Sequence, residues 1–209
     1  MKKEDGMSEA ELDQHHAERM AKRKAARDRM LATKTIEEKG LLIVHTGKGK
    51  GKSTAAFGLA ARAIGNGLKV GIVQFVKGKW ETGERVVLEK FPELCDIHVM
   101  GEGFSWDTQD RQRDIAAAKA AWAQAKTMLA DPSYALIVLD ELNIVLRYDN
   151  LDITDVVSTL EARRDDLHVI VTGRNAKPEL IEAADLVTEM GEIKHHFKVG
   201  VKAQKGIEF

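Results

Sequence analysis

Short apolar runs alternate with helix-like patterns over most of the chain. Runs such as LLIV and ALIVL are apolar at every position, which indicates strands that are buried on both faces of a sheet. This alternation of strands and helices predicts an α/β fold with a doubly wound, mainly parallel sheet. The expected strands are residues 41–45, 69–76, 96–100, 135–140, 168–172 and 186–189. The expected helices are residues 53–64, 84–90, 108–129, 154–163 and 178–184.

The first 40 residues differ from the rest, because they are rich in Ala, Lys, Arg, Glu and Asp and contain no Val. Ser8 and Glu11 fit a capping box, in which the serine hydroxyl accepts one backbone N–H and the glutamate carboxylate accepts another. This pattern predicts the start of a helix. We therefore divide the chain into an N-terminal helical arm, residues 1–40, and one α/β domain, residues 41–209.

The arm carries an excess of positive charge. Between Arg19 and Lys34 there are seven basic residues and one acidic residue. A solvated helix is the usual explanation of such a run of charge. The alternative is a lid that lays its basic face over an anionic ligand. We keep this alternative because the residues after the arm include a candidate phosphate-binding site, described below.

The chain as a whole carries almost no net charge: 32 Lys and Arg residues oppose 33 Asp and Glu residues, for a formal net charge of −1. No overall field therefore attracts the protein to nucleic acid or to anionic lipid, and neither is expected as a partner. No apolar run approaches the roughly 20 residues that cross a bilayer, so we expect a cytoplasmic protein. The single cysteine, Cys95, has no partner for an internal disulfide, and core packing is its expected role.

The strongest local signal is the stretch HTGKGKGKST, residues 45–54, which follows an apolar strand and precedes a helix. This is the setting of a phosphate-binding loop, because glycines let backbone N–H groups turn inward and the helix N-terminus adds positive potential. Lys52 adds a full charge, and the hydroxyl of Ser53 suits Mg²⁺. The expected nucleotide-binding residues of this loop are Thr46, Gly47, Lys48, Gly49, Lys50, Gly51, Lys52, Ser53 and Thr54.

The loop departs from the standard pattern in one place. That pattern has glycine five positions before Gly51, where this chain has Thr46, and Gly47 comes one residue late. We therefore expect the phosphates to be cradled differently from the usual case. A merely flexible Gly/Lys turn is a weaker explanation, because three lysines within five residues repel one another unless an anion gathers them.

Two further strands end in residues that suit nucleotide chemistry. Asp140 ends one expected strand and Glu141 follows it; beside a phosphate loop, an acid at this place holds Mg²⁺ directly or through water. Arg174 follows another strand, where it would clamp a terminal phosphate; a surface ion pair is the alternative. Together with the loop, these residues predict Mg-nucleotide binding by an α/β fold of the P-loop NTPase type.

Two classes of activity are open at this point. One is a hydrolytic ATPase in which Glu141 polarises the attacking water and Asp140 serves Mg²⁺; the other is a transferase that moves part of the nucleotide to a second substrate. The stretch GEGFSWDTQ sets Phe104 and Trp106 two residues apart in a polar, glycine-bearing loop. Core packing is the ordinary role of two such rings, but loops bury large rings poorly, so the pair is a candidate for contact with a ligand.

Six stretches in the chain occur together and in the same order in one family of enzymes. They are HTGKGKGKSTAAFG, VGIVQFVKG, GFSWDTQ, VLDELN, VTGR and GVKAQKGIEF. GFSWDTQ and GVKAQKGIEF are far more specific than a phosphate loop. Through these stretches the α/β part of the chain resembles the P-loop type of ATP:corrinoid adenosyltransferase, also called cob(I)alamin or cob(I)yrinic acid a,c-diamide adenosyltransferase.

The resemblance implies that the protein transfers the 5′-deoxyadenosyl group of ATP to the Co(I) centre of a reduced corrinoid and releases triphosphate. In this family ATP lies reversed in the loop, so that C5′ faces the acceptor. The resemblance also implies Mg²⁺ or Mn²⁺ as the metal, a flavoprotein as the electron donor and a homodimer as the assembly. Co(I) is a nucleophile that carries no proton, so its attack on C5′ needs no general base.

The resemblance assigns roles to residues around the nucleotide. Ser53 and Glu141 match the metal ligands, with Asp140 behind them. Lys52 and its loop match the cradle for the triphosphate. The positions that match nucleotide-contacting arginines are Arg62 and Arg174. Lys48 stands where the family often has Asn, which we expect to alter the affinity for nucleotide.

The remaining matches concern the second substrate and the termini. Phe104 and Trp106 match an aromatic pair that crowds the lower face of the corrin and excludes its axial ligand, which makes Co(II) easier to reduce. The basic N-terminal helix matches a segment that folds over the bound substrates. The C-terminal residues 194–209 are interpreted as packing and dimer surface, with no chemical role.

Overall fold

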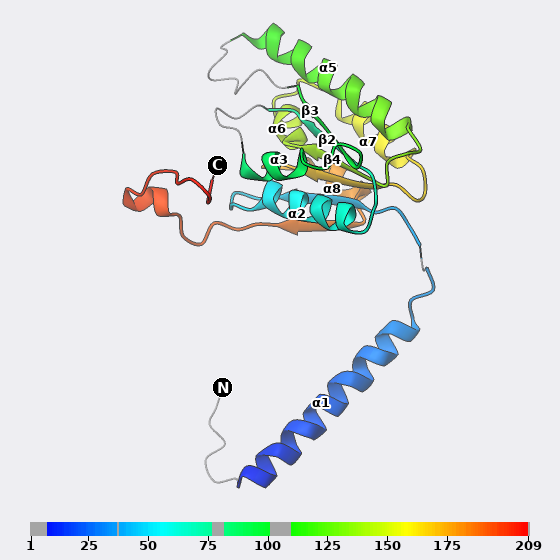
Figure 1. Cartoon of the computed structure of the whole chain (residues 1–209), viewed down its shortest axis with the longest axis vertical. Helices are drawn as coiled ribbons and strands as arrows, with labels where there is room; N and C mark the ends of the chain where they lie inside the picture. The colour runs from blue at the N-terminus through cyan, green and yellow to red at the C-terminus, as the bar shows by residue number, and fades with distance from the viewer. Residues whose placement is uncertain (1–7, 37, 77–81, 101–109, 209) are drawn as a thin grey trace. The chain divides into compact units, whose positions relative to one another are not determined.

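The computed structural model describes residues 8–36, 38–76, 82–100 and 110–208. The chain divides into two compact units, Met1–Glu38 and Lys39–Phe209. Figure 1 shows the first unit as one helix and the second as a sheet flanked by helices. Within the described part of the chain, no helix is both long enough and apolar enough to cross a membrane.

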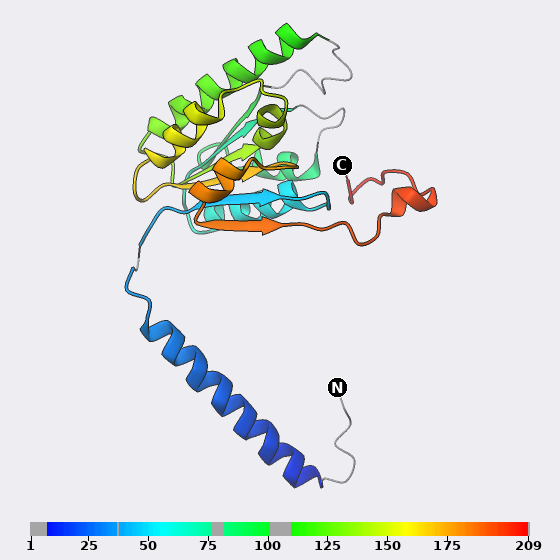
Figure 2. The ribbon, with the colours of Figure 1, turned by 180° about the vertical axis from the view of Figure 1, so that it is seen from behind.

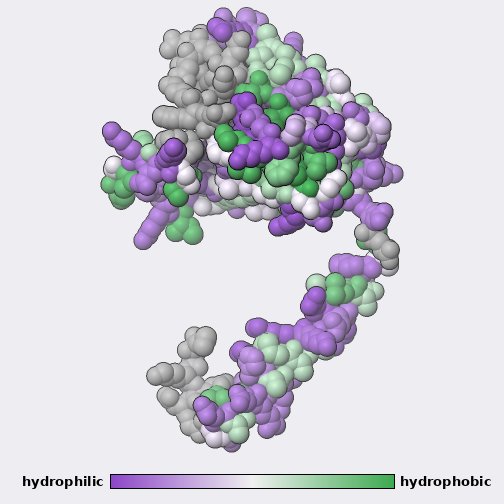
Figure 3. Space-filling view, in the orientation of Figure 1, coloured by the Kyte–Doolittle hydropathy of each residue, from purple (hydrophilic) through white to green (hydrophobic). Residues whose placement is uncertain are grey.

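The N-terminal unit is the helix α1, Glu9–Ala32. Its capping box is confirmed: Ser8 Oγ accepts the Glu11 N–H at 3.4 Å, and Glu11 Oε2 accepts the Ser8 N–H at 2.8 Å. None of the residues of α1 is buried, and polar side chains dominate its surface in Figure 3. The helix therefore has the character of the solvated, basic arm that the sequence predicts.

The second unit is built on a parallel sheet of six strands in the order β3-β2-β4-β5-β1-β6. Every neighbouring pair is parallel, so the predicted doubly wound α/β sheet is confirmed. The predicted strands are all present, and their ends differ from prediction by two residues at most. The strands are β1 Leu42–Thr46, β2 Val70–Gln74, β3 Cys95–Val99, β4 Leu136–Asp140, β5 His168–Thr172 and β6 Leu186–Glu189.

Helices cover both faces of the sheet (Figures 1 and 2). One face packs against α2, Lys52–Gly65, and α3, Gly83–Leu88, and its core includes the buried side chain of Cys95. Core packing of this cysteine is thus confirmed, and burial raises the pKa of its thiol to about 11. The other face packs against α5 Arg111–Ala130, α6 Leu142–Arg147, α7 Ile153–Glu161 and α8 Pro178–Ala183.

Two short helices were not predicted: α6 and the 3-10 helix η1, His196–Val199. Each spans only a few residues, too few for a helical period to show in the sequence. The helix expected at residues 108–129 is present as α5, whose N-cap is Asp110; residues 108 and 109 lie outside the described chain.

Parallel strands bring their carboxyl ends to one edge of the sheet. At the centre of that edge β4, β5 and β1 lie side by side. The phosphate-loop stretch follows β1, Glu141 follows β4, and Arg174 comes shortly after β5. The three stretches that the sequence singled out for nucleotide chemistry therefore meet at one place.

Candidate active site

The loop between β1 and α2 has a backbone that requires glycine. Gly47 and Gly51 have φ angles of 95° and 104°, and Gly51 is the N-cap of α2. The loop also lies against the backbone that follows β6. A Cβ on Gly47 would lie 2.5 Å from Met190 O, and one on Gly49 would lie 2.6 Å from Gly191 O. Glycines at these positions therefore let the loop curl at the start of α2.

Thr46 explains the departure from the standard loop pattern. Its Oγ1 accepts the backbone N–H of Ala176 at 3.0 Å, in the segment between β5 and α8. A glycine at this position could not make that bond. The loop is thus tied through Thr46 to the segment that carries Arg174.

Lys52 is buried at the floor of the loop, with 6% of its surface exposed. Its Nζ donates to Gly49 O at 2.6 Å, so the ammonium is held by its own loop. Burial lowers the pKa of Lys52; the Glu141 carboxylate opposes this effect, and the charges of Arg174 and Lys50 add to it. Lys52, Glu141 and Arg174 therefore interact electrostatically across the edge of the sheet.

The other cations of the loop region lie in different surroundings. Lys50 Nζ pairs with Glu208 Oε1 at 2.5 Å, and His196 Nε2 lies 3.2 Å from the same oxygen. The C-terminal segment is thus joined to the loop by charge. Lys48 is exposed and borders the cavity described below.

Two predicted nucleotide-binding residues lie away from the floor of the loop. Thr54 is exposed, and its Oγ1 is 3.5 Å from Glu84 Oε1 of α3. Arg62 lies in the last turn of α2, about 15 Å along the helix axis from Lys52 at 1.5 Å per residue. There it borders a hollow of about 280 Å³ near the amino ends of β1, β4 and β5. Within this chain, Arg62 is not brought to the loop.

Asp140 is held by its neighbours in the sheet, and only 4% of its surface is exposed. Its Oδ1 accepts the Thr172 hydroxyl at 2.7 Å, and its Oδ2 accepts the Gln74 side-chain amide at 3.1 Å. The same Thr172 Oγ1 accepts the backbone N–H of Glu141 at 2.9 Å. Both Asp140 oxygens are thus engaged, which suits a residue behind the metal ligands.

Glu141 has the opposite character, because its carboxylate is buried without being satisfied. It is the N-cap of α6 and adopts a left-handed backbone with φ 60°. Its Oε2 is buried and has no hydrogen-bond partner within the described chain. Burial and the charge of Asp140 raise the pKa of Glu141 to about 7, although Lys52 and Arg174 oppose the shift. This oxygen is thus open to a partner that the described residues do not supply.

Arg174 is exposed and borders a cavity of about 810 Å³ beside the loop. Basic residues from several elements line this cavity, together with two carboxylates. The bases are Lys48, Arg147, Arg174 and Lys198, and the acids are Glu189 and Glu192. The loop and the cavity together offer a polar, cation-rich surface at the edge of the sheet.

Sequence reasoning assigned no role to several polar residues at this edge. Gln74, His45 and Thr172 each lie at or near the end of an otherwise apolar strand, and Asn143 lies in α6. His45 Nδ1 is 3.4 Å from Lys52 O, beneath the start of α2. Gln74, His45 and Thr172 could have been predicted from the sequence, because each is a polar residue near the end of an apolar strand at this edge. Phe104 and Trp106 lie outside the described residues.

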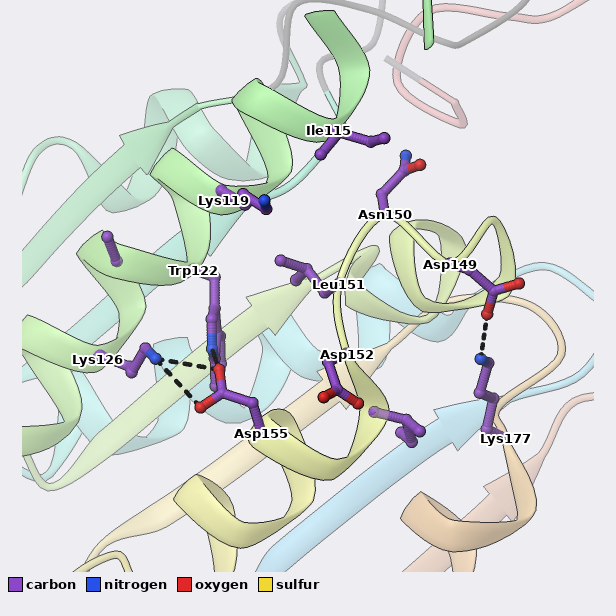
Figure 4. A pocket seen from close by; sticks show the side chains of 12 residues that line it. Ile115, Lys119, Trp122, Lys126, Asp149, Asn150, Leu151, Asp152, Asp155 and Lys177 are labelled. Atoms are coloured by element: carbon purple, nitrogen blue, oxygen red, sulfur yellow. Dashed lines mark hydrogen bonds and ion pairs between the residues drawn. The ribbon is translucent and has the colours of Figure 1, made fainter. Parts of the chain in front are cut away.

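A second hollow, of about 690 Å³, lies between α5 and the segment leading into α7, away from the loop (Figure 4). Four of its charged groups form two ion pairs: Lys126 Nζ binds Asp155 at 3.0 Å, and Lys177 Nζ binds Asp149 at 2.5 Å. Trp122 also donates to Asp155, at 2.7 Å. Because these groups already satisfy each other, we do not assign this hollow to the site.

Two family models match the chain. One, described as ATP:corrinoid adenosyltransferase BtuR/CobO/CobP, matches residues 38–209; the other, described as Cob(I)alamin adenosyltransferase N terminal, matches residues 6–31. A corrinoid adenosyltransferase of Pseudomonas aeruginosa is 56% identical over 95% of this chain and 98% of its own. The corrinoid adenosyltransferase CobA of Salmonella typhimurium is 47% identical over 94% and 99%. Among solved structures, the RadB recombinase is 17% identical over 76% of this chain and 77% of its own, with a TM-score of 0.48.

Proposed function

The chain belongs to the ATP:corrinoid adenosyltransferase family BtuR/CobO/CobP, and from this premise we propose how its residues divide the work. The reaction is ATP-dependent adenosylation of a corrinoid: Co(I) attacks C5′ of ATP, the C5′–O bond breaks, and triphosphate leaves. The relatives do not support the alternative of a hydrolytic ATPase. The observation that carries the assignment to residues is that Lys52, Glu141 and Arg174 follow the carboxyl ends of three adjacent parallel strands, β1, β4 and β5.

The chemistry of the edge is electrostatic. Negative charge grows on the triphosphate as it leaves, and fixed cations and N–H groups stabilise such charge without reorganising. Lys52 and the loop amides hold the phosphates, and Arg174 contacts them from the other side of the loop. Since Co(I) brings no proton, the reaction needs no general base. The role that we propose for Glu141 is therefore to bind metal.

The residues present fit a divalent cation. Glu141 Oε2 is buried without a partner among the described residues, and Ser53 lies in the first turn of α2 with its hydroxyl as a further ligand. Mg²⁺ is commonly held by one or two protein oxygens together with substrate phosphates, and Mn²⁺ takes similar ligands. A divalent metal, when bound, supplies neutralising charge beside the phosphates. Asp140 orients the turn that carries Glu141.

The products of the reaction test the function directly. The purified protein, supplied with MgATP and chemically reduced cobalamin, should release one triphosphate for each adenosylated corrinoid formed. Chromatography of the nucleotide products and the absorbance change of the corrinoid measure the two quantities. Release of ADP and phosphate without adenosylated corrinoid would reject the transfer.

Phe104 and Trp106 are proposed to face the lower side of the corrin and exclude its axial ligand. Changing either to alanine should lower turnover at least about tenfold, or about 1.4 kcal/mol, when Co(II) must be reduced on the enzyme. Much of the activity should remain when Co(I) is generated chemically beforehand. Parallel assays from the two cobalt states measure the difference, with Phe91→Ala, an exposed ring, as the control. Equal losses from both states would mean that the rings merely support the fold.

The helix α1 is proposed as a lid over the bound substrates. Its exposed basic surface suits the phosphates of ATP, and residues 6–31 match a model of the N-terminal segment of cob(I)alamin adenosyltransferases. Deleting residues 1–33 should leave a folded α/β domain, because α1 contributes no buried side chain. The KM for the corrinoid should rise about tenfold. Circular dichroism and steady-state kinetics measure the two effects, and a truncated chain that cannot fold would contradict the lid.

The assembly is proposed to be a homodimer. Strand β6 is an edge strand, and it and the segment after it expose many apolar side chains, which a second copy would cover. These are Leu186, Val187, Ile193, Phe197, Val199 and Ile207.

A flavoprotein is the proposed source of electrons for Co(II), and the cytoplasm is the proposed location.

A further inference from the structure

Asn143 lies at the centre of the edge that carries the proposed site, yet nothing in the chemistry above uses it. It belongs to α6, two residues after Glu141, and its exposed fraction is 0%. Amide side chains are seldom buried so completely unless their groups are hydrogen-bonded. Its contacts therefore show what the position requires.

The side chain of Asn143 reaches from α6, just after β4, to the turn after β5. Its Nδ2 donates to Gly173 O at 3.0 Å, in a buried bond between residues far apart in the chain. Gly173 has φ 127°, and a Cβ there would lie 2.8 Å from Asn143 Cβ and 3.0 Å from Glu141 Oε2. The two turns are thus in direct contact, with the Glu141 carboxylate packed against Gly173. Arg174 is the next residue.

Two further bonds join the ends of the same two strands. Thr172 of β5 donates to Asp140 Oδ1 and accepts the N–H of Glu141. Thr172 therefore fixes the backbone at the start of the Glu141 turn, while Asn143 fixes the carbonyl immediately before Arg174. Together the two side chains close a loop of contacts around Glu141 and Gly173.

The other end of the Asn143 amide is not satisfied. Its Oδ1 is buried without a hydrogen-bond partner within the described chain. Exchanging the amide's O and N would not help, because the oxygen would then face the Gly173 carbonyl. A buried unpaired acceptor lowers stability, so fold stability alone does not explain this amide. The hydrogen bond that the Asn143 amide donates to the Gly173 carbonyl is the contact that a role for this residue must explain.

We propose that Asn143 is a positioning residue that holds the Glu141 carboxylate and the Arg174 guanidinium at the spacing needed to grip metal-bound triphosphate. This inference rests on the proposed function, because it takes Glu141 and Arg174 as the groups that contact metal and phosphate. Asn143 itself touches neither. It acts through the carbonyl of Gly173 and the close contact of the two turns.

The test is Asn143→Leu, which keeps the branched shape of the side chain but removes the donor. The dissociation constant of MgATP, measured by isothermal titration calorimetry on the full chain, should rise at least tenfold, and kcat with chemically reduced cobalamin should fall. Thr159→Val is the control: it removes a side-chain bond to a carbonyl, Asp155 O at 2.7 Å, on α7 away from the loop. This control should bind MgATP and turn over as the unmodified protein does.

A double-mutant cycle separates positioning from general support of the fold. If Asn143 acts through the Arg174 turn, Asn143→Leu should weaken MgATP binding less than twofold in an Arg174→Ala background. A full, additive loss in that background, or unchanged binding in the single variant, would overturn the proposal. If Asn143→Leu does not fold, Asn143→Ser removes the same bond and is judged by the same criteria.

The cycle also distinguishes failure of this inference from failure of the proposed function. If Arg174→Ala alone leaves MgATP binding unchanged, the role given to Arg174 is wrong. The same cycle is then run against Glu141→Gln, where additivity would again overturn the role of Asn143.

Discussion

Replacing Lys52 with alanine should reduce adenosyl transfer at least about a hundredfold, the usual loss when a fixed donor to developing negative charge is removed. The ammonium is buried in the floor of the loop, where it donates to Gly49 O at 2.6 Å. Loss of this charge removes the buried cation of the loop, and Lys50 does not replace it because Lys50 is paired with Glu208. Formation of adenosylated corrinoid from chemically generated Co(I), at saturating ATP, is the measurement.

Two controls make the Lys52 result specific. Lys119→Ala removes an exposed lysine of α5, outside the loop, and should leave turnover unchanged. Circular dichroism and a cooperative unfolding transition should show that the Lys52→Ala protein is folded. Normal turnover by that folded variant would reject the assignment of residues 46–54 as the phosphate site.

Glu141→Gln should have two opposite effects, loss of activity and gain of stability. Activity should fall at least about a hundredfold because the amide is a poor ligand for the metal that neutralises the phosphates. Stability of the ligand-free protein should rise because the buried carboxylate, with its unpaired Oε2, is removed. A site built to bind a cation is commonly strained without it.

The gain in stability should depend on pH in a definite direction. The pKa of Glu141 is raised from 4.5 to about 7 in the folded protein, so the folded state holds this proton more tightly than the unfolded state. Glu141 therefore costs nothing below pH 4.5, costs progressively more as the pH rises, and reaches its full cost above pH 7. That full cost is on the order of 3 kcal/mol, at 1.36 kcal/mol for each pKa unit.

Urea unfolding with EDTA present, at pH 5 and at pH 8.5, measures this effect. The Glu141→Gln protein should exceed the unmodified protein in free energy of unfolding at pH 8.5 and by much less at pH 5. Glu182→Gln, an exposed carboxylate of α8, should shift stability by no more than about 0.5 kcal/mol at either pH. Equal stability of the Glu141 variant and the unmodified protein at pH 8.5 would contradict the burial of an unpaired charge.

The fold was predictable because its signals are local. Runs that are apolar at every position, such as residues 136–139 of β4, are short stretches of consecutive residues. Their alternation with helical patterns allows few topologies. The α6 helix was missed for the same reason: six residues, LNIVLR, show too little of a helical period. The N-cap of this helix is Glu141, which has a left-handed backbone. The residues next to Glu141 in the sequence do not predict that conformation.

The candidate site was predictable only in part. The loop from Thr46 to Thr54 could be proposed as a phosphate site because one continuous stretch carries its glycines, its lysines and its hydroxyls. Glu141 and Arg174 could be placed at the same edge because parallel strands end together. Arg62 shows the limit of such reasoning: a match of motif does not give distance, and on this chain it lies at the other end of α2.

The sequence by itself determined the class of sheet and the family, and it predicted the phosphate loop, because the signals of each lie in short stretches of consecutive residues. Only the tertiary structure decided which side chains share a contact. Gln74, Asp140 and Thr172 meet because of the order and alignment of three strands, and Asn143 reaches Gly173 because two turns pack together. Such contacts join residues 30 to 66 positions apart. Each depends on strand order, register and turn geometry, which follow from packing of the whole domain and not from any one stretch of residues.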